Sequence, residues 1–500
     1  MTATPRTEAK KYEFKTQPYE HQKSAIRAAW GRTGFAYLLE MGTGKSKIAI
    51  DELCAYWEYG LIDTALVLAP KGVYLNWTRE DPEAPGELLR HMPDRIRERA
   101  TIMEWRPGGG SKTHTDRLLT LLQPSEGLRI LVMNTEALSS GSVAYEYAER
   151  FLRSGRALMT VDESTFIKNS RAERTRRVTR LGRLAVFRRI MTGSPVTKGP
   201  MDLYSQFEFL GPELLGFPSF FSYRARYAVT KQKTFGGARR PTTIIVAYRE
   251  LDDLSRRIAP HSFRVTKEEC LDLPPKIYTQ RDVEMTDDQW RMYREMKQSA
   301  VSLIESSGTY VSASDVIVQI LRLQQLVCGF VADEDGNVHD VTDSRVQQLM
   351  DILGETGGKT IIWSKYRHSI HQIVGALSKE RGPQSVVQYH GQTSREDREQ
   401  ASVRFQNDPT CEYIVSTTET GGFGNTWHAA HNVVYFSNGY DLEKRLQSED
   451  RAHRAGLSHP VTYIDMVARG TVDESIIKAL RRKIDLASAV TGDGYKDWLI

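Results

Sequence analysis

The stretch Glu40-Met41-Gly42-Thr43-Gly44-Lys45-Ser46 follows a short apolar run and precedes a stretch with helical periodicity, Lys47 to Glu58. Glycines let backbone amides close around phosphate oxygens, a lysine reaches terminal phosphates, and a serine hydroxyl at a helix N-terminus can ligate magnesium. The strict pattern has glycine where this chain has Leu39, but the other glycines, the lysine and the serine are present. The stretch therefore predicts a site for ATP and Mg²⁺. The residues predicted to bind the nucleotide here are Met41, Gly42, Thr43, Gly44, Lys45 and Ser46, with Ser46 also on the metal.

A nucleotide hydrolase also needs an acidic pair on a later strand. Leu158 to Val161 predicts a buried strand, and Asp162 and Glu163 follow it directly. Ligands of open α/β sheets bind at the carboxyl ends of the strands. An isolated Asp-Glu pair is usually surface charge, but this context favours Asp162 on the metal through water and Glu163 as catalytic base.

Short apolar runs alternate with helical stretches twice along the chain, and this alternation predicts parallel sheets covered by helices. The expected strands are Phe35–Leu39, Ala65–Leu68, Ile130–Met133, Leu158–Val161 and Arg189–Met191, then Thr360–Trp363, Ser385–Tyr389, Tyr413–Ser416, Val433–Phe436 and Val461–Met466. The expected domains are a flexible N-terminus at 1–15, an α/β lobe at 16–205, a mostly helical insert at 206–345 with a Gly-rich turn at 235–237, a second α/β lobe at 346–480, and a C-terminal helix and tail at 481–500.

Composition excludes several classes of protein. The 68 Lys and Arg against 63 Asp and Glu give a net charge of +5 on 500 residues, too weak to indicate an anionic partner by itself. Eight arginines stand between Arg171 and Arg189 against one acid, Glu173, and a phosphate-facing stripe and a solvated helix face explain them equally well. Four scattered cysteines predict buried, reduced thiols rather than a zinc or redox site. No apolar run reaches the roughly 18 residues of a membrane span, and no secretory signal is present, so we expect a cytoplasmic protein in a bacterium or a viral host.

A further motif, Gln447-Ser448-Glu449-Asp450-Arg451-Ala452-His453-Arg454-Ala455-Gly456, lies near the end of the second α/β run. Arginine is always charged, and its planar fork can meet phosphoryl oxygens as charge develops during transfer. Arg451 and Arg454 stand three apart, so on one helical turn they would share a face and point into a cleft between the lobes. From about Pro18 to Leu480, these motifs resemble those of superfamily 2 helicases, and within them the Swi/Snf-type double-stranded DNA translocases. Other segments similar to this family are Pro18-Tyr19-Glu20-His21-Gln22, Leu68-Ala69-Pro70, Val132-Met133-Asn134-Thr135-Glu136, Ile167-Lys168-Asn169, Met191-Thr192-Gly193-Ser194-Pro195, Asp202-Leu203-Tyr204-Ser205, Leu273-Pro274-Pro275-Lys276 and the stretch 416–425.

The resemblance implies two RecA-like lobes with parallel sheets flanked by helices, plus a mostly helical insert between them. It implies ATP hydrolysis with Mg²⁺, a nucleotide base near Tyr19 and Gln22, and further nucleotide contacts at Gly422 and Asn425. The catalytic residues that it implies are Lys45, Asp162, Glu163, Gln447, Arg451 and Arg454. The DNA-binding residues that it implies are Lys71, Asn76, Trp77, Asn134, Lys168, Asn169, Lys365, Thr417 and Trp427.

Two stretches depart from the family pattern. Ser164-Thr165 stands after the acidic pair, where many relatives carry Ala or Gly and then His. Thr426-Trp427-His428 replaces small apolar residues, and a buried aromatic is favoured over base stacking for Trp427.

The leading functional hypothesis is a monomeric ATP-driven motor on double-stranded or branched DNA, active in replication, recombination or repair, whose lobes close on ATP. Three alternatives stay open: a nucleotide-gated DNA clamp without productive hydrolysis, a helicase that truly unwinds DNA or RNA, and a small-molecule kinase. The kinase is disfavoured because it has no use for a paired arginine motif 400 residues after the phosphate loop. The sequence indicates no membrane partner and does not identify protein partners.

Overall fold

The computed structural model describes residues 12–81, 85–106, 112–233, 242–306, 313–333, 335–421, 426–454 and 456–491. The chain forms two compact units: unit 1 is Met1–Arg226 with Glu250–Leu271, and unit 2 is Tyr227–Arg249 with Asp272–Ile500. None of the helices in the described part has the length and apolar character that a membrane span needs. The predicted Gly-rich turn at 235–237 lies outside the described residues.

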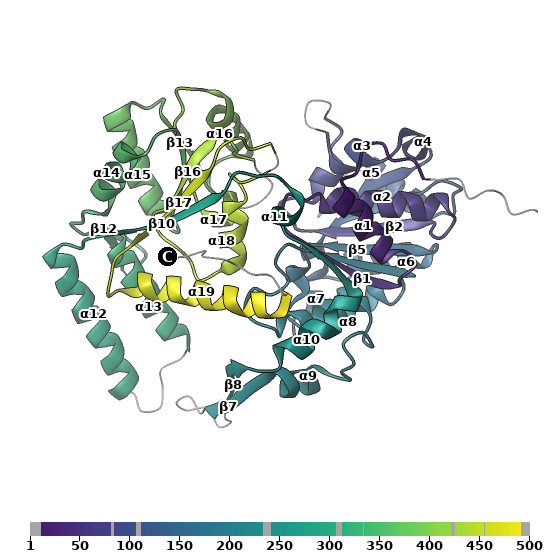
Figure 1. Cartoon of the computed structure of the whole chain (residues 1–500), viewed down its shortest axis with the longest axis horizontal. Coiled ribbons are helices and arrows are strands. Elements are labelled where there is room, and N and C mark those ends of the chain that lie inside the picture. Colours follow the sequence, from purple (N-terminus) through teal and green to yellow (C-terminus); the bar gives the residue numbers. More distant parts are fainter. Residues whose placement is uncertain are drawn as a thin grey trace, which may run out of the picture. The chain divides into compact units, whose positions relative to one another are not determined.

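A parallel sheet of seven strands, in the order β3-β4-β2-β5-β6-β1-β9, forms the centre of unit 1 (Figure 1). β1, β2 and β4 are buried along their whole length. Strands covered on both faces are expected to be apolar throughout rather than alternating, which explains the continuous runs in the sequence. The strands are β1 (Gly34–Leu39), β2 (Thr64–Ala69), β3 (Thr101–Glu104), β4 (Arg129–Asn134), β5 (Ala157–Asp162), β6 (Phe187–Met191) and β9 (Ser262–Val265). The α-helices are α1 (Glu20–Ala29), α2 (Lys45–Glu58), α3 (Glu87–His91), α4 (Asp94–Arg97), α5 (Lys112–Leu121), α6 (Val143–Arg153), α7 (Glu173–Gly182), α8 (Asp202–Leu210), α9 (Phe220–Tyr227), α10 (Leu251–Ile258) and α11 (Lys267–Cys270).

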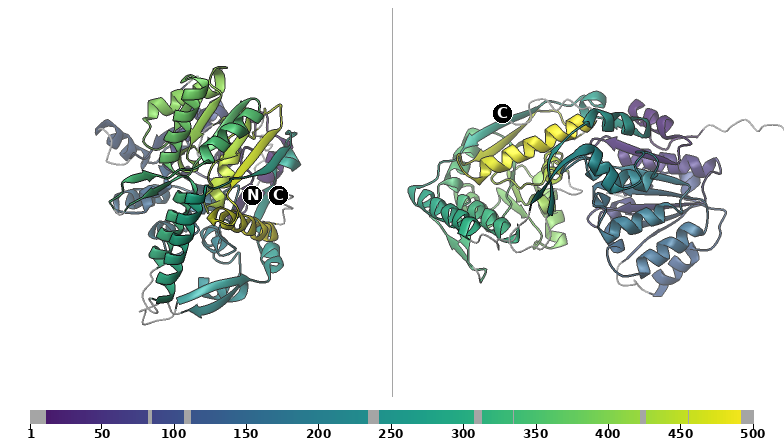
Figure 2. Two further views of the ribbon diagram at one scale, coloured as in Figure 1. Left: turned by 90° about the vertical axis from the view of Figure 1, so that its left-hand side faces the viewer. Right: turned by 90° about the horizontal axis from the view of Figure 1, so that it is seen from below.

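Unit 2 has its own parallel sheet of six strands, in the order β10-β17-β16-β13-β15-β14. α12 and α13 lie side by side and project away from this sheet, and α19 forms the last long helix (Figures 1 and 2). The strands are β10 (Lys276–Asp282), β13 (Lys359–Trp363), β14 (Val386–Tyr389), β15 (Tyr413–Ser416), β16 (Ala430–Tyr435) and β17 (Val461–Val467). The helices are α12 (Asp287–Ser306), α13 (Ala313–Val327), α14 (Arg345–Glu355), α15 (Arg367–Arg381), α16 (Arg395–Asn407), α17 (Thr418–Gly421), α18 (Leu442–Glu449) and α19 (Val472–Thr491).

The two sheets flanked by helices confirm the predicted fold class, and each expected strand is present within one to three residues at its ends. The segment 206–345 also contains strands that the sequence analysis did not predict. β9 pairs with β1 at the edge of the first sheet, and β10 pairs with β17 at the edge of the second. Both strands are half-exposed, so they lack the apolar run that marked the central strands. Two hairpins complete the segment: β7 (Ala228–Lys233) with β8 (Thr242–Tyr248), and β11 (Phe330–Ala332) with β12 (Val338–Asp340).

Each unit has a separate hydrophobic core, formed by the sheet faces and the helices above them. Cys54, Cys328 and Cys411 are free and buried, as predicted, whereas Cys270 is half-exposed. The units are therefore stabilised by apolar burial, the dominant favourable term in folding.

Candidate functional site

The phosphate loop, residues 40–46, connects β1 to α2. Gly42 and Gly44 have φ angles of +80° and +87°, a region that glycine adopts without steric cost. A β-carbon at Gly44 would also lie 2.2 Å from Nε2 of Gln22. Glycine at position 44 is therefore required twice, by the backbone angle and by the side chain above it.

The Lys45 ammonium is held over this loop by the loop itself. Its Nζ donates to the carbonyl oxygens of Leu39 at 3.0 Å and Glu40 at 3.2 Å, and the Thr43 hydroxyl donates to the same Glu40 oxygen at 2.7 Å. A half-buried cation at a helix N-terminus attracts an anion, because the first amides of the helix are also unpaired donors. The geometry of the loop therefore fits the phosphates of a nucleotide.

The segment before α1 supports the loop from the other side. The buried Gln22 side chain accepts from the Tyr19 amide at 3.0 Å and donates to the Thr43 carbonyl at 3.1 Å. His21 also contacts that carbonyl, at 2.8 Å, and its ring stacks on the exposed ring of Tyr19. Gln22 thus braces the loop here, and the stacked ring of Tyr19 is the part of the segment open to a nucleotide base.

The acidic pair lies where predicted, at the carboxyl end of β5. Trp77 donates through Nε1 to Asp162 Oδ2 at 3.3 Å, and the Glu163 amide donates to Asp162 Oδ1 at 3.0 Å. Burial raises the pKa of Asp162, while the charge of Lys45 and the hydrogen bond from Trp77 act in the opposite direction. Lys45 and Asp162 therefore interact within one site. Glu163 has a φ of +49°, which a residue with a side chain rarely adopts, and such strain is often found at functional sites.

This site fits a magnesium ion that is shared with a nucleotide. Among the described residues, no group of three or more His, Cys, Asp or Glu side chains could hold a metal alone. Mg²⁺ usually keeps several waters and binds one or two carboxylates together with substrate phosphates. Ser46, in the first turn of α2, and Asp162 are the side chains that fit this requirement.

Ser164, which departs from the family pattern, links the acidic pair to the segment 191–195, another stretch that resembles the family. Its hydroxyl donates to Gln206 Oε1 at 2.6 Å, and Gln206 Nε2 donates to the Pro195 carbonyl at 2.9 Å. Lys168 contacts the hydroxyl of Thr197 at 2.7 Å, two residues beyond the same segment. Sequence reasoning missed Gln206, because nothing in the local pattern distinguishes it from any other helical glutamine.

The structure corrects two of the DNA contacts expected in unit 1. Trp77 is buried in the core and bonded to Asp162, so it supports the acidic pair and has no surface for DNA. Asn134 is 2% exposed, and its side chain accepts from the Ala137 amide at 2.7 Å, so it caps the turn that follows β4. Lys71 and Asn169 are exposed, and Asn76 and Lys168 are half-exposed.

Unit 2 holds the arginine segment, Gln447–Arg454. α18 ends at Glu449, so the prediction that Arg451 and Arg454 share a helical turn is wrong. Arg451, 4% exposed, donates to the Gln447 carbonyl at 3.0 Å. Arg454 donates to the Asp450 carbonyl at 3.1 Å and to the Thr426 hydroxyl at 2.7 Å. Gln447 Oε1 is buried and accepts no hydrogen bond from any described residue.

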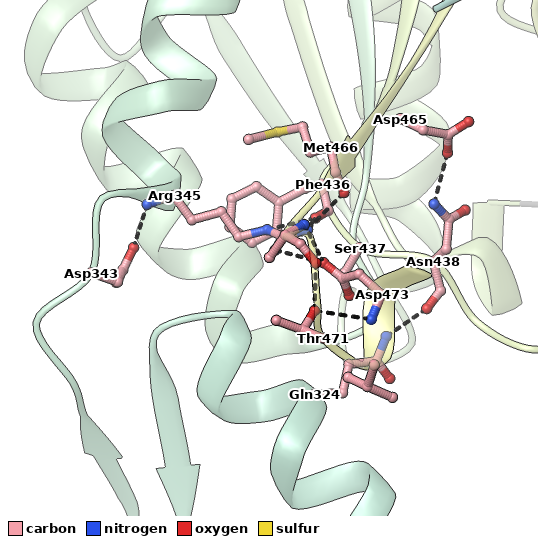
Figure 3. A network of polar contacts seen from close by, with 12 residues as sticks. Gln324, Asp343, Arg345, Phe436, Ser437, Asn438, Asp465, Met466, Thr471 and Asp473 are labelled. Carbon is pink, nitrogen blue, oxygen red and sulfur yellow. Dashed lines mark hydrogen bonds and ion pairs between the residues drawn. The ribbon is translucent and has the colours of Figure 1, made fainter. Parts of the chain in front are cut away.

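A buried polar network anchors the arginine segment to the sheet of unit 2. Arg445 of α18 binds Asp465 of β17 through two nitrogens, at 2.5 and 3.0 Å, and Glu449 at 2.9 Å. Asn438 donates to Asp465 at 2.7 Å (Figure 3). It also accepts from Arg445 at 2.7 Å. Gln324 of α13 donates to the Asn438 carbonyl at 2.7 Å, which connects the helical segment to the same network (Figure 3).

A second part of the network surrounds Arg345 at the start of α14. Its side chain donates to the carbonyls of Phe436 and Met466 and pairs with Asp473 at 2.9 Å (Figure 3). Buried charges are tolerated where partners and hydrogen bonds replace water, as they do here. Through Arg345 the network therefore connects the start of α14 to the residue after β16, to β17 and to the first turn of α19.

The remaining residues predicted in unit 2 have different surroundings. Lys365 donates to Gln324 at 2.7 Å, and burial lowers the pKa of its ammonium group. Thr417 is buried and donates to the Thr420 hydroxyl at 3.1 Å. Trp427 is 0% exposed, so it is a core residue and not a DNA contact. Gly422 and Asn425 lie outside the described residues.

Two parallel α/β sheets, with a phosphate loop and an acidic strand end in the first unit, define the class of helicase-like nucleotide hydrolases. The family model "SNF2-related domain" matches residues 21–330, and the model "Helicase conserved C-terminal domain" matches residues 344–456. The chain belongs to the SNF2-related family, a family of helicase-like ATPases.

Three similar proteins illustrate the breadth of this family. Protein CHROMATIN REMODELING 4 of Arabidopsis thaliana is 23% identical over 94% of this chain and 21% of its own length. TATA-binding protein-associated factor mot1 of Aspergillus fumigatus is 25% identical over 66% of this chain and 20% of its own. An uncharacterized ATP-dependent helicase of Mycoplasma genitalium is 24% identical over 89% of this chain and 39% of its own. The chain thus spans about a fifth of the first two relatives, and organisms this varied give no support to a bacterial or viral host cytoplasm.

Two solved structures are also similar to the chain. The SWI2/SNF2 ATPase core of Sulfolobus solfataricus in complex with dsDNA is 22% identical, with a TM-score of 0.41, and the match covers 96% of this chain and 95% of that one. The C-terminal part of the Fun30 ATPase domain is 16% identical, with a TM-score of 0.36, over 44% of this chain and 98% of that one.

Proposed function

We propose that this protein hydrolyses ATP to move along duplex DNA. The observation that supports this most directly is that the Lys45 ammonium, the glycine loop and the half-buried Asp162 lie together in unit 1. Membership of the SNF2-related family supports the use of ATP.

In the proposed reaction, ATP supplies the phosphoryl group and Mg²⁺ neutralises its developing charge. The amides of residues 42–46 and the Lys45 ammonium bind the phosphates, and Ser46 with Asp162 holds the metal. Trp77 fixes the orientation of Asp162 through its indole hydrogen bond and excludes water from one side of the carboxylate. Glu163 accepts a proton from the attacking water, and its strained backbone sets the direction of its side chain.

Gln447, Arg451 and Arg454 complete the proposed catalytic set. Arg451 and Arg454 each use Nε to hold a carbonyl of their own segment, and Arg454 also donates to the Thr426 hydroxyl. A planar guanidinium is the group expected to meet phosphoryl oxygens in the proposed reaction. The buried Oε1 of Gln447 is a further acceptor that a bound group could satisfy.

The proposed DNA contacts of unit 1 are Lys71, Asn76, Lys168 and Asn169, because these side chains reach the surface. In unit 2 the half-exposed Lys365 remains a proposed contact, whereas Thr417 is buried and is not proposed. Contacts of this kind bind the phosphate backbone and carry no sequence information, so base sequence should matter little. Binding should weaken steeply with salt, because each neutralised phosphate releases counterions.

Steady-state ATP turnover, measured without DNA and with single strands, duplexes, forks and four-way junctions, tests the proposal. We expect duplex DNA to raise turnover. Turnover that ignores every nucleic acid would reject the motor, and binding of DNA without turnover would favour the nucleotide-gated clamp. A strand-displacement assay in parallel separates translocation from true unwinding.

Glu163→Gln is the matched variant, since it keeps the size of the side chain and removes the base. We expect ATP binding to remain and turnover to fall roughly 100-fold or more. Turnover at the parental rate would show that Glu163 is not the base.

A further inference from the structure

A groove of about 200 Å³ on unit 1 is lined by residues of α7 and by Glu208 of α8. These two helices lie side by side (Figure 1). Its lining combines three cations, Arg176, Arg180 and Arg183, with hydroxyl groups from Thr175 and Thr179. Arg176 shares Glu173 with Arg177, whereas no ion pair within 4.0 Å links Arg180 or Arg183 to an acid in the described part of the chain. The proposed nucleotide site uses none of these residues.

Six of the eight arginines from Arg171 to Arg189 fall into two groups in the structure, and the other two are Arg171, which is exposed, and Arg188, which is half-exposed. Arg174, Arg177 and Arg189 are used inside unit 1: they bind the Phe166 carbonyl, the carbonyls of Leu138 and Gly141, and the Glu52 carboxylate, respectively. Arg176, Arg180 and Arg183 are exposed. Arg176, Arg180 and Arg183 are therefore members of the charge cluster that solvent or an external anion can reach.

Thr175 is a separate sign that the groove takes a ligand. Its side chain is 2% exposed and lines the groove, and its Oγ1 has no hydrogen-bond partner among the described residues. Buried polar atoms without partners are uncommon in folded proteins, and an unfilled acceptor or donor often marks a binding position. Hydroxyl groups beside arginines are a usual combination for phosphate oxygens.

The spacing of the three arginines suits an extended chain of phosphates. Residues 176, 180 and 183 lie on one side of the helix, and they span about 10 Å at a rise of about 1.5 Å per residue. One strand of duplex DNA advances about 3.4 Å per nucleotide along its axis, so the groove matches about three nucleotides. Ser170, which also lines the groove, follows Asn169, an exposed residue of the proposed DNA-contact segment.

We infer that the α7 groove binds the phosphodiester backbone of nucleic acid, as a contact beyond those that the family resemblance implies. The inference rests on the proposed function, because it assigns the groove to the DNA on which the motor would move. The net charge of the three arginines and Glu208 is positive by two, and Glu208 is the carboxylate among the residues that line the groove. Burial raises the pKa of Glu208 and Arg183 lowers it, so the two side chains interact electrostatically.

Because Glu208 is negative and the arginines are positive, substitutions in the groove should be able to weaken or to strengthen duplex binding. Fluorescence anisotropy of a labelled 30-base-pair duplex, without ATP and over a range of salt concentrations, measures affinity. The double variant Arg180→Gln/Arg183→Gln should reduce the slope of log K against log salt by about 2, which corresponds to binding weaker by roughly 10- to 100-fold at about 0.1 M salt. Glu208→Gln should strengthen binding, a change that misfolding would not produce.

Arg97→Gln is the control, because Arg97 is an exposed arginine on α4 of the same unit and does not line the groove. It should change the salt slope by no more than a few tenths. Equal affinities for the parent, the double variant and Glu208→Gln would overturn the inference. The inference would also be overturned if the groove variants lost affinity for a phosphoserine peptide but kept their affinity for the duplex, since the occupant would then be a protein.

The proposed function and this inference fail in different ways. A parent protein that neither binds duplex nor responds to it with ATP turnover rejects the proposed function. A parent that binds and responds, beside groove variants that behave like the parent, rejects the inference alone.

Discussion

The phosphate loop of unit 1 and the buried network around Arg445 in unit 2 hold their charges in opposite ways. In the loop, Lys45 donates to two backbone carbonyls, those of Leu39 at the end of β1 and Glu40, and the loop is shaped by glycines. Around the arginine segment, Arg445 meets Asp465 and Glu449 inside a buried network. The first arrangement leaves charge available for an external anion, whereas the second neutralises charge within the protein. Substitutions in the loop should therefore alter chemistry more than stability, and substitutions in the network should do the reverse.

Lys45→Ala gives the largest expected effect. ATP turnover should fall to background, because no other side chain of the loop can neutralise the terminal phosphates. Stability should change by about 1–2 kcal/mol, since the variant loses two hydrogen bonds from a half-buried ammonium to backbone carbonyls. Phosphate release and thermal unfolding measure the two quantities, with Lys23→Ala on the surface of α1 as the control. Near-parental turnover of the Lys45 variant would show that the loop does not supply the charge used in ATP hydrolysis.

Arg454→Lys should lower ATP turnover by about 10³-fold, as expected for an arginine finger, while ATP and DNA affinity are largely kept. Lysine preserves the charge but loses the planar fork, and Arg451→Lys should also show a measurable decrease. Arg395→Lys, on the exposed face of α16, controls for the loss of an arginine elsewhere in unit 2. A correctly folded Arg454→Lys protein with parental turnover would mean that the arginine is a structural residue of its turn.

Arg445→Met tests the network. Removal of one partner leaves buried carboxylates unpaired, which costs about 3–5 kcal/mol in comparable sites. We expect roughly 3 kcal/mol, because Asp465 keeps Asn438 and Glu449 keeps Lys276 and Tyr278. Denaturant unfolding measures the loss. The neighbouring Lys444→Met should cost well under about 1 kcal/mol, since its ion pair with Glu419 is on the surface; equal losses for the two variants would show that the network does not stabilise unit 2.

Trp427→Phe gives the smallest expected effect. It removes the hydrogen bond from Nε1 to the Ser402 hydroxyl, 2.7 Å long, but keeps an aromatic ring beside Trp363 and Tyr389. Stability should fall by about 2 kcal/mol, from the lost hydrogen bond and the smaller buried ring. Ser402→Ala should cost about 1 kcal/mol, and the double variant should lose less than the sum of the two. Duplex affinity, measured by anisotropy, should not change; a clear decrease in affinity with unchanged stability would restore Trp427 as a DNA contact.

The sequence by itself determined the parallel α/β class, the central strands and the positions of the phosphate loop and the acidic pair. These features are local: a glycine loop between a strand and a helix depends on nearby backbone angles, and a strand buried on both faces is apolar along its whole length. The same local logic located the acidic pair, because it directly follows such a strand.

Only the tertiary structure decided which polar and aromatic side chains face a ligand and which are buried. Trp77, Asn134 and Trp427 sit in motifs that resemble DNA contacts, yet each is covered by elements from elsewhere in the chain. The edge strands β9 and β10 acquire their place by pairing with β1 and β17, more than 180 residues away in sequence. The physical reason is the same in both cases: burial and pairing are set by the partners that folding brings together, and a short sequence pattern contains no information about those partners.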